Sequence, residues 1–186
     1  MPLPLASSNS SPKGAIVPIG FVIANGSSNQ ITFNNIPQNY TDLQLVCSMR
    51  STYAGTADYP KFYYNNDSQS GTSYSYTRIY GDGSGASSGR ITNSPNWNTD
   101  LSPAANNGAY IFGSFKFDIM NYSNTTTYKG MIGRVAVNLG SSGYTFAYVG
   151  TRQSLSAITR IDYVMGLGNF AAGSTFALYG IRSYGQ

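Results

Sequence analysis

The sequence contains no histidine and no glutamate, and it has a single cysteine, Cys47, among its 186 residues. Without histidine the chain can build neither a Ser-His nor a Cys-His pair, and it lacks the commonest zinc ligand. One cysteine cannot form an internal disulfide or a thiolate cluster. Cys47 stands in an apolar run, so we expect it to behave as a small buried hydrophobe.

Polar residues that favour helices are also scarce, because glutamate is absent and charged residues make up only 10% of the chain. Too few remain to cover the outer faces of several amphipathic helices. In their place stand 16 tyrosines, 9 phenylalanines and 21 glycines, among many Ser, Thr and Asn residues. Aromatic and β-branched residues suit strands, and small polar residues suit turns. The composition therefore predicts an all-β protein.

The charge is low and dispersed. Eleven Lys and Arg residues face seven Asp residues, which gives a net charge of +4, and no two basic residues are adjacent. Nucleic-acid binders usually gather their bases in one stripe, so this pattern argues against nucleic acid as a partner. It fits solubility or docking onto an acidic surface. No apolar run approaches the ~20 residues of a membrane span, and the N-terminus lacks the features of a signal peptide, so we expect no membrane contact.

Alternating patterns predict about 8–10 strands. The clearest has Leu43, Leu45, Cys47 and Met49 on one face. Pro18 interrupts an earlier apolar run and indicates an edge strand or a bent segment there. Short strands separated by turn residues favour two antiparallel sheets around one core, so we expect a jelly-roll-like antiparallel β-sandwich.

The chain is expected to form one β-sandwich domain over residues 15–186. Residues 1–14 have no periodicity and are expected to form an extended, flexible or partner-bound N-terminal arm. Residues 81–107 show the weakest strand signal and contain the only tryptophan, Trp97. They are interpreted as a long surface loop, a place where function is often found.

The carboxylates give little support to catalysis. Asp42, Asp118 and Asp162 fall on the outward side of predicted strands and are expected to be solvated surface residues. Asp82 lies in a Gly-Asp-Gly-Ser-Gly run, which indicates a turn more than a calcium site. No phosphate-binding glycine motif occurs. We therefore predict no enzymatic activity, no catalytic residue, no cofactor and no bound metal.

The tyrosines are the remaining candidates for a functional role. Tyrosine supplies a large, fairly rigid contact area with a polar tip, so it is enriched at protein interfaces, and it also stacks on sugar rings. The alternatives are a place in the core or on strand surfaces, a protein interface, and a glycan-binding surface. The candidate interface residues are Tyr59, Tyr63, Tyr64, Tyr74, Tyr76, Tyr80 and Trp97.

Four stretches of the sequence carry a resemblance, namely residues 1–5, 31–43, 80–84 and 174–182. In these the chain resembles small virion structural proteins of tailed phages, in particular phages of aquatic bacteria such as cyanobacteria. The resemblance spans nearly the whole chain and its motifs are structural. It implies a jelly-roll-like module that assembles as a symmetric homo-oligomer, commonly a trimer on capsids, and it transfers no functional residue.

The expected function is that of a capsid cement (decoration) protein, which stabilises the phage head by binding the assembled lattice. Its expected partners are the major capsid protein or other virion proteins, and its expected location is the virion, after synthesis in the host cytoplasm. The alternative is a tail-fibre or baseplate protein that binds host-surface glycans through the region around Trp97.

Overall fold

The structure is a computed structural model, and it describes residues 16–67 and 73–182. The predicted arm, residues 1–14, lies outside the described residues. Every strand pairing in the described part of the chain is antiparallel. Within the same residues, no helix has the length and apolar character needed to cross a bilayer.

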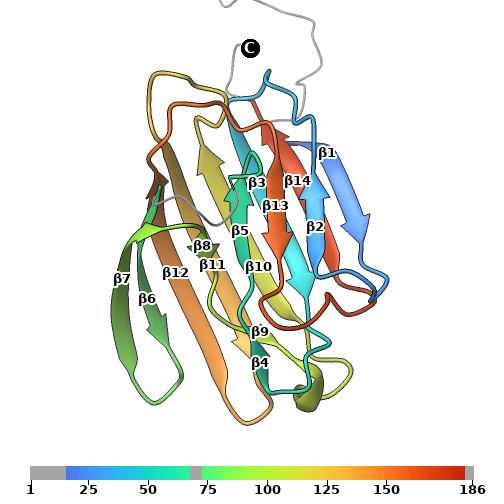
Figure 1. The fold of residues 1–186 in the computed structure, drawn as a ribbon. Coiled ribbons are helices and arrows are strands. Elements are labelled where there is room, and N and C mark those ends of the chain that lie inside the picture. Colours follow the sequence, from blue (N-terminus) through green and yellow to red (C-terminus); the bar gives the residue numbers. More distant parts are fainter. Residues whose placement is uncertain (1–15, 68–72, 183–186) are drawn as a thin grey trace, which may run out of the picture.

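Two sheets dominate the architecture (Figure 1). The larger contains, in spatial order, β1 (Ile16–Ile23), β14 (Thr175–Ile181), β3 (Asp42–Met49), β10 (Gly113–Met120), β11 (Lys129–Asn138), β12 (Gly143–Arg152), β6 (Tyr74–Gly81) and β7 (Ala86–Ser94). The smaller contains β2 (Gln30–Phe33), β13 (Ile161–Val164), β5 (Lys61–Tyr64) and β8 (Trp97–Asn98). A third pairing joins β4 (Ala57–Asp58) to β9 (Ser102–Pro103), next to the 3-10 turn η1 (Ala105–Asn107).

The two sheets face each other, so the predicted all-β sandwich is confirmed. Jelly-roll connectivity stays a prediction. The predicted count of 8–10 strands was too low, because the described residues form fourteen strands. Three of these, β4, β8 and β9, have only two residues each, which is too short for an alternating pattern to reveal.

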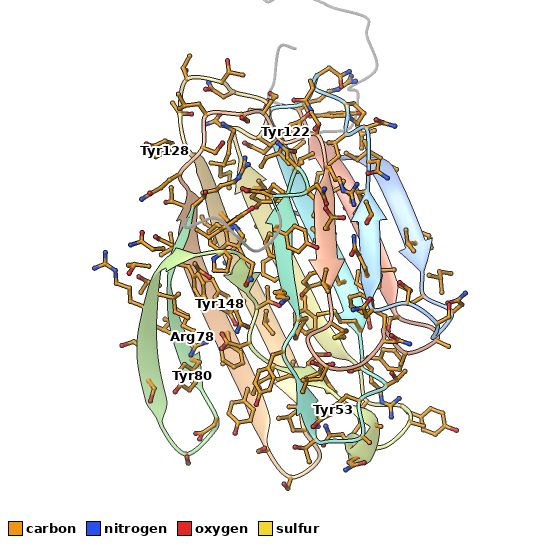
Figure 2. All side chains as sticks on the ribbon, in the orientation of Figure 1. Tyr53, Arg78, Tyr80, Tyr122, Tyr128 and Tyr148 are labelled. Carbon is orange, nitrogen blue, oxygen red and sulfur yellow. The ribbon has the colours of Figure 1, made fainter. Side chains whose placement is uncertain are left out.

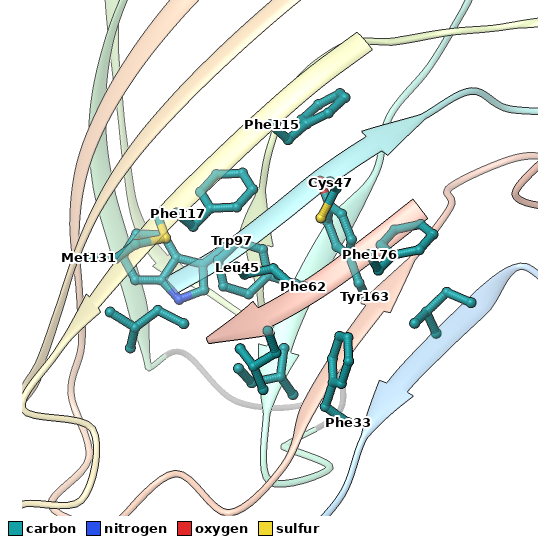
Figure 3. Close-up of a cluster of buried hydrophobic side chains, with 14 of the residues drawn as sticks. Phe33, Leu45, Cys47, Phe62, Trp97, Phe115, Phe117, Met131, Tyr163 and Phe176 are labelled. Atoms are coloured by element: carbon teal, nitrogen blue, oxygen red, sulfur yellow. The ribbon is translucent and has the colours of Figure 1, made fainter. Parts of the chain in front are cut away.

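The core lies between the sheets and is rich in aromatic rings (Figure 3). β3 lines it as predicted, because Leu43, Leu45, Cys47 and Met49 are all buried. Figure 3 shows Cys47 among Phe115, Phe176 and Tyr163. Burial raises the pKa of the Cys47 thiol well above its ordinary value, which keeps the group protonated and unreactive.

The apolar run around Pro18 is an edge strand, which is the first of the two predicted alternatives. β1 lies at one edge of the larger sheet and pairs only with β14 among the described strands. The register shifts between Pro18 and Gly20, which is the irregularity expected where proline removes a backbone donor from a ladder.

The prediction of a long surface loop over residues 81–107 was wrong. That region contains the nine-residue strand β7 and the short strands β8 and β9, followed by η1. Its Ser, Gly and Asn content hides the strands, because an edge strand that is exposed on both sides needs no apolar alternation.

The prediction that Asp162 is a solvated surface residue was also wrong, because Asp162 is fully buried on β13. Arg160 donates to both carboxylate oxygens at 2.7 Å, and the hydroxyl of Thr32 donates to Oδ1 at the same distance. Gln30 Nε2 donates at 2.8 Å. These donors replace the water that the carboxylate would otherwise need.

Candidate protein interface

Most of the residues predicted to form an interface lie in the core instead. Five of the seven side chains are buried, namely Tyr63, Tyr64, Tyr74, Tyr76 and Trp97. The rings of Tyr64, Tyr74, Tyr76 and Trp97 pack against one another between β5 and β8 of the smaller sheet and β6 of the larger one. The interpretation of these five as interface residues is therefore corrected, since a ring without exposed area cannot contact a partner of the folded domain.

Trp97 is the centre of this aromatic group. Its ring stacks on Phe62 at 6.1 Å and on Tyr76 at 5.8 Å between centroids, and it meets Tyr74 edge-on at 5.8 Å. Burial raises the pKa of Tyr74 and of Tyr76. The ring that was expected in a surface loop is thus a core residue, and it offers no platform for a glycan.

Tyr80 and Tyr59 keep part of their surface. The Tyr80 ring stacks on Phe146 at 5.4 Å, and the Arg78 guanidinium lies 5.6 Å from its centroid. Arg78 forms an ion pair with Asp100, which also accepts a 2.6 Å hydrogen bond from the Tyr148 hydroxyl. Figure 2 shows Arg78, Tyr80 and Tyr148 together beside β6 and β12. Because Arg78 and Tyr148 both bind the Asp100 carboxylate, we interpret this cluster as part of the packing of the fold.

A fully buried carboxylate, Asp58, fixes one end of the sandwich. We call this end the rim; it comprises the segments around Ser51, Asp58 and Leu167. Asp58 accepts hydrogen bonds from the backbone N–H groups of Tyr59 at 2.7 Å, Leu167 at 2.9 Å and Gly168 at 2.9 Å. The Ser51 hydroxyl donates to it at 2.5 Å. Four donors to one anion fix two segments that are far apart in the sequence, and hydrogen bonds to a charged group are among the stronger ones.

The same rim presents apolar side chains to water. Tyr59 is 50% exposed, and Tyr53 and Leu167 are exposed as well. The Tyr53 backbone N–H donates to the Ser51 hydroxyl at 3.1 Å, which links it to the Asp58 network. Figure 2 shows Tyr53 at this end of the molecule. Of the seven predicted residues, only Tyr59 belongs to such an exposed set, and sequence patterns did not identify its neighbours.

Several exposed apolar side chains lie on the outer face of the eight-stranded sheet, which we call the outer sheet face. Phe21, Ile79 and Val149 are 64%, 62% and 60% exposed, and Val46 and Ile132 are exposed too. The register places Phe21, Ala177 and Val46 in one row across neighbouring strands. An apolar area of this kind on one face is typical of a contact surface.

Two cations meet in the middle of this face. Lys116 on β10 lies directly opposite Arg134 on β11. Like charges in directly opposite positions destabilise an antiparallel pair. The Lys116 ammonium has an acidic neighbour in Asp118, at 4.0 Å, and that carboxylate also accepts from Gln44 Nε2 at 2.7 Å. The centre of the face is therefore positive and open to an added anion.

A groove of about 640 Å³ crosses the outer sheet face at this place. Its lining combines apolar side chains, hydroxyl groups and the two cations: Phe21, Val46, Ser48, Ser114, Lys116, Arg134, Ala136, Thr145, Thr175, Ala177 and Tyr179. Such a lining can bind through apolar contact, hydrogen bonds and pairing with carboxylates. In the part of the chain that the structure describes, no group of three His, Cys, Asp or Glu side chains could hold a metal ion.

No family model, no curated protein and no solved structure matches this chain.

Proposed function

We propose that the chain is a structural protein of a phage particle, and specifically a capsid cement protein that docks on the assembled head through its outer sheet face. Binding of this kind stabilises the lattice because the protein has affinity for the assembled state and not for its separated subunits. The proposal includes a location in the virion and the major capsid protein as the partner.

One observation carries the proposal, and it is the composition of the outer sheet face. Exposed Phe21, Val46 and Ile132 surround the facing cations Lys116 and Arg134. An acidic protein surface would cover the apolar side chains and place a carboxylate between the two cations, which removes their repulsion. The resemblance to small virion proteins supports the same reading, since those proteins act by adhesion.

The glycan-binding alternative has no comparable support. It depended on Trp97 and nearby tyrosines as stacking platforms for sugars, and Trp97 is buried between Phe62 and Tyr76. Replacing Trp97 with alanine would therefore test the stability of the core and not sugar binding.

The test uses particles of the phage that encodes the chain, separated into heads and tails. Purified protein should sediment with heads and not with tails. Arg134→Glu should weaken binding to heads at least tenfold, because it reverses one of the two central charges. Lys61→Glu is the matched control, since Lys61 lies on β5 of the other sheet and the change in charge is the same.

Equal binding of both variants would show that the outer sheet face is not the docking surface. Sedimentation with tails alone would contradict the cement function itself. A cryo-EM map of whole particles provides an independent check, because density for the chain is expected on the outer surface of the head.

A further inference from the structure

The two edges of the eight-stranded sheet are protected differently. Edge strands expose unpaired backbone groups, and proteins usually block them with proline, bulges or charge. β1 carries Pro18 and a register shift. β7 has no proline and one charged residue, Arg90, and its pairing with β6 is regular from Ala86 to Ile91. Its irregularity lies only at the far end, where the register shifts between Tyr74 and Tyr76 of β6.

The free backbone groups of β7 can be assigned from the hairpin. The Asp82 N–H donates to the Gly85 carbonyl at 3.3 Å. Backbone groups in an antiparallel pair point alternately toward and away from the partner strand. Counting from that bond, Ser88 and Arg90 direct their N–H and C=O groups away from β6. Among the described strands β7 has β6 as its one neighbour, so these groups have no strand partner there.

The side chains of β7 define what kind of strand fits beside it. Eight of its nine residues are small or polar, the exception being Ile91, and both of its faces are largely exposed. A strand added beside it would also be exposed on both faces, so it should lack large apolar residues on either side. Residues 5–11, Leu-Ala-Ser-Ser-Asn-Ser-Ser, form a proline-free stretch between Pro4 and Pro12 and match this pattern at every position after Leu5, which would stand at the end of the added strand.

We propose that residues 5–11 of one copy of the chain add as a strand to the β7 edge of a neighbouring copy. Residues 5–11 cannot pair with β7 of their own copy, because the chain that connects them to β1 is too short. β1 and β7 are the first and last strands of the sheet and lie on opposite sides of the molecule (Figure 1). Seven spacings of about 4.8 Å separate them by roughly 34 Å. The chain from Ser11 to Ile16 spans at most about 18 Å.

Each copy then gives one strand and receives one. Such a head-to-tail contact generates a closed ring when its rotation closes, as in a trimer. The backbone hydrogen bonds supply affinity that depends little on side-chain identity, as in other cases of strand addition. The inference goes beyond the proposed function, because it concerns contacts between copies and is tested on the isolated protein.

The experiment measures binding of a fluorescent peptide of residues 1–15 to protein that lacks residues 1–11. We expect saturable binding by fluorescence anisotropy, together with slower hydrogen exchange of β7 amides. Ser88→Pro removes an outward N–H and should weaken peptide binding at least tenfold. Ser88→Ala retains that N–H and should bind as the parent does. The full-length chain should be oligomeric, and the shortened chain monomeric, in sedimentation velocity.

Three results would overturn the inference. These are peptide binding that is unchanged in Ser88→Pro, absence of any peptide binding, and a shortened chain that remains oligomeric because β7 pairs with itself. If Ser88→Pro fails to fold, the substitution moves to the peptide. Ser8→Pro in the peptide should then abolish its binding to the parent protein, and unchanged binding would contradict strand addition.

Discussion

The ring of Trp97 occupies the space that a side chain at Gly150 would need. A Cβ atom added to Gly150 on β12 would overlap Cζ3 and Cη2 of the Trp97 ring. The two residues come from opposite sheets, Trp97 from β8 and Gly150 from β12. The distance between the sheets at this point is therefore set by an indole ring packed against bare backbone.

Gly150→Ala should lower the free energy of unfolding by about 1–3 kcal/mol, the usual cost of overfilling a packed core. Equilibrium unfolding in urea measures this. Gly130→Ala on β11 is the control, since a Cβ there meets nothing within 4 Å. That variant should be as stable as the parent or slightly more stable. Equal stability of the two variants would show that the core yields around Trp97.

Asp58→Asn should destabilise the rim by about 2–4 kcal/mol, because the amide group can no longer accept from all of the backbone N–H groups and the Ser51 hydroxyl. Urea unfolding gives the change in free energy, and hydrogen exchange should be fastest at Leu167 and Gly168. Asp82→Asn is the control, since its exposed oxygen accepts turn bonds that an amide oxygen can also accept. If the amide hydrogens of Leu167 and Gly168 exchange as slowly as in the parent, the role assigned to Asp58 is wrong.

Alkaline pH should lower the stability of the protein. Burial raises the pKa of Tyr64, Tyr74, Tyr148 and Tyr163. The unfolded state releases these phenol protons near pH 10, before the folded state does. Their contribution to stability is therefore complete below about pH 9 and falls as the pH rises above about 10. Urea unfolding at pH 8 and pH 11, with phenolate absorbance at 295 nm, checks this. Equal midpoints at both pH values would contradict it.

Arg134→Glu should stabilise the isolated domain while it weakens binding to the head. The introduced carboxylate would face Lys116 directly across the strands and replace a repulsive pair by an attractive one. The expected gain is about 0.5 kcal/mol. Thermal unfolding at low and high salt measures it, and the gain should shrink as salt increases. A loss of stability would mean that Lys116 and Arg134 do not repel each other in the free protein.

Alternation along the chain was sufficient to predict the long inner strands. In β3, β10 and β11 one face meets the core and the other meets water, so inward and outward residues differ in kind. Pro18 likewise marked an edge through its missing donor. In these cases the residues of the strand itself determine its position in the sheet, so the sequence is enough to predict it.

The candidate interface was harder to predict, because burial depends on which sheet covers which face. Tyr64 and Tyr74 look like surface aromatics in the sequence, yet they meet across the sandwich with their ring centroids 6.0 Å apart. Asp58 and Leu167 are 109 positions apart, so no spacing rule connects them. One feature of the sequence did indicate the outer sheet face: Val46, Ile132 and Val149 are apolar residues on the outward side of their strands.

The Asp58 network holds its rim through backbone N–H groups, and these are the same whatever side chains the residues carry. Substitution at Tyr59 or Leu167 would change what the rim presents to its surroundings while the carboxylate keeps its donors. Point mutations can therefore change the chemical character of this end of the molecule without altering the backbone beneath it.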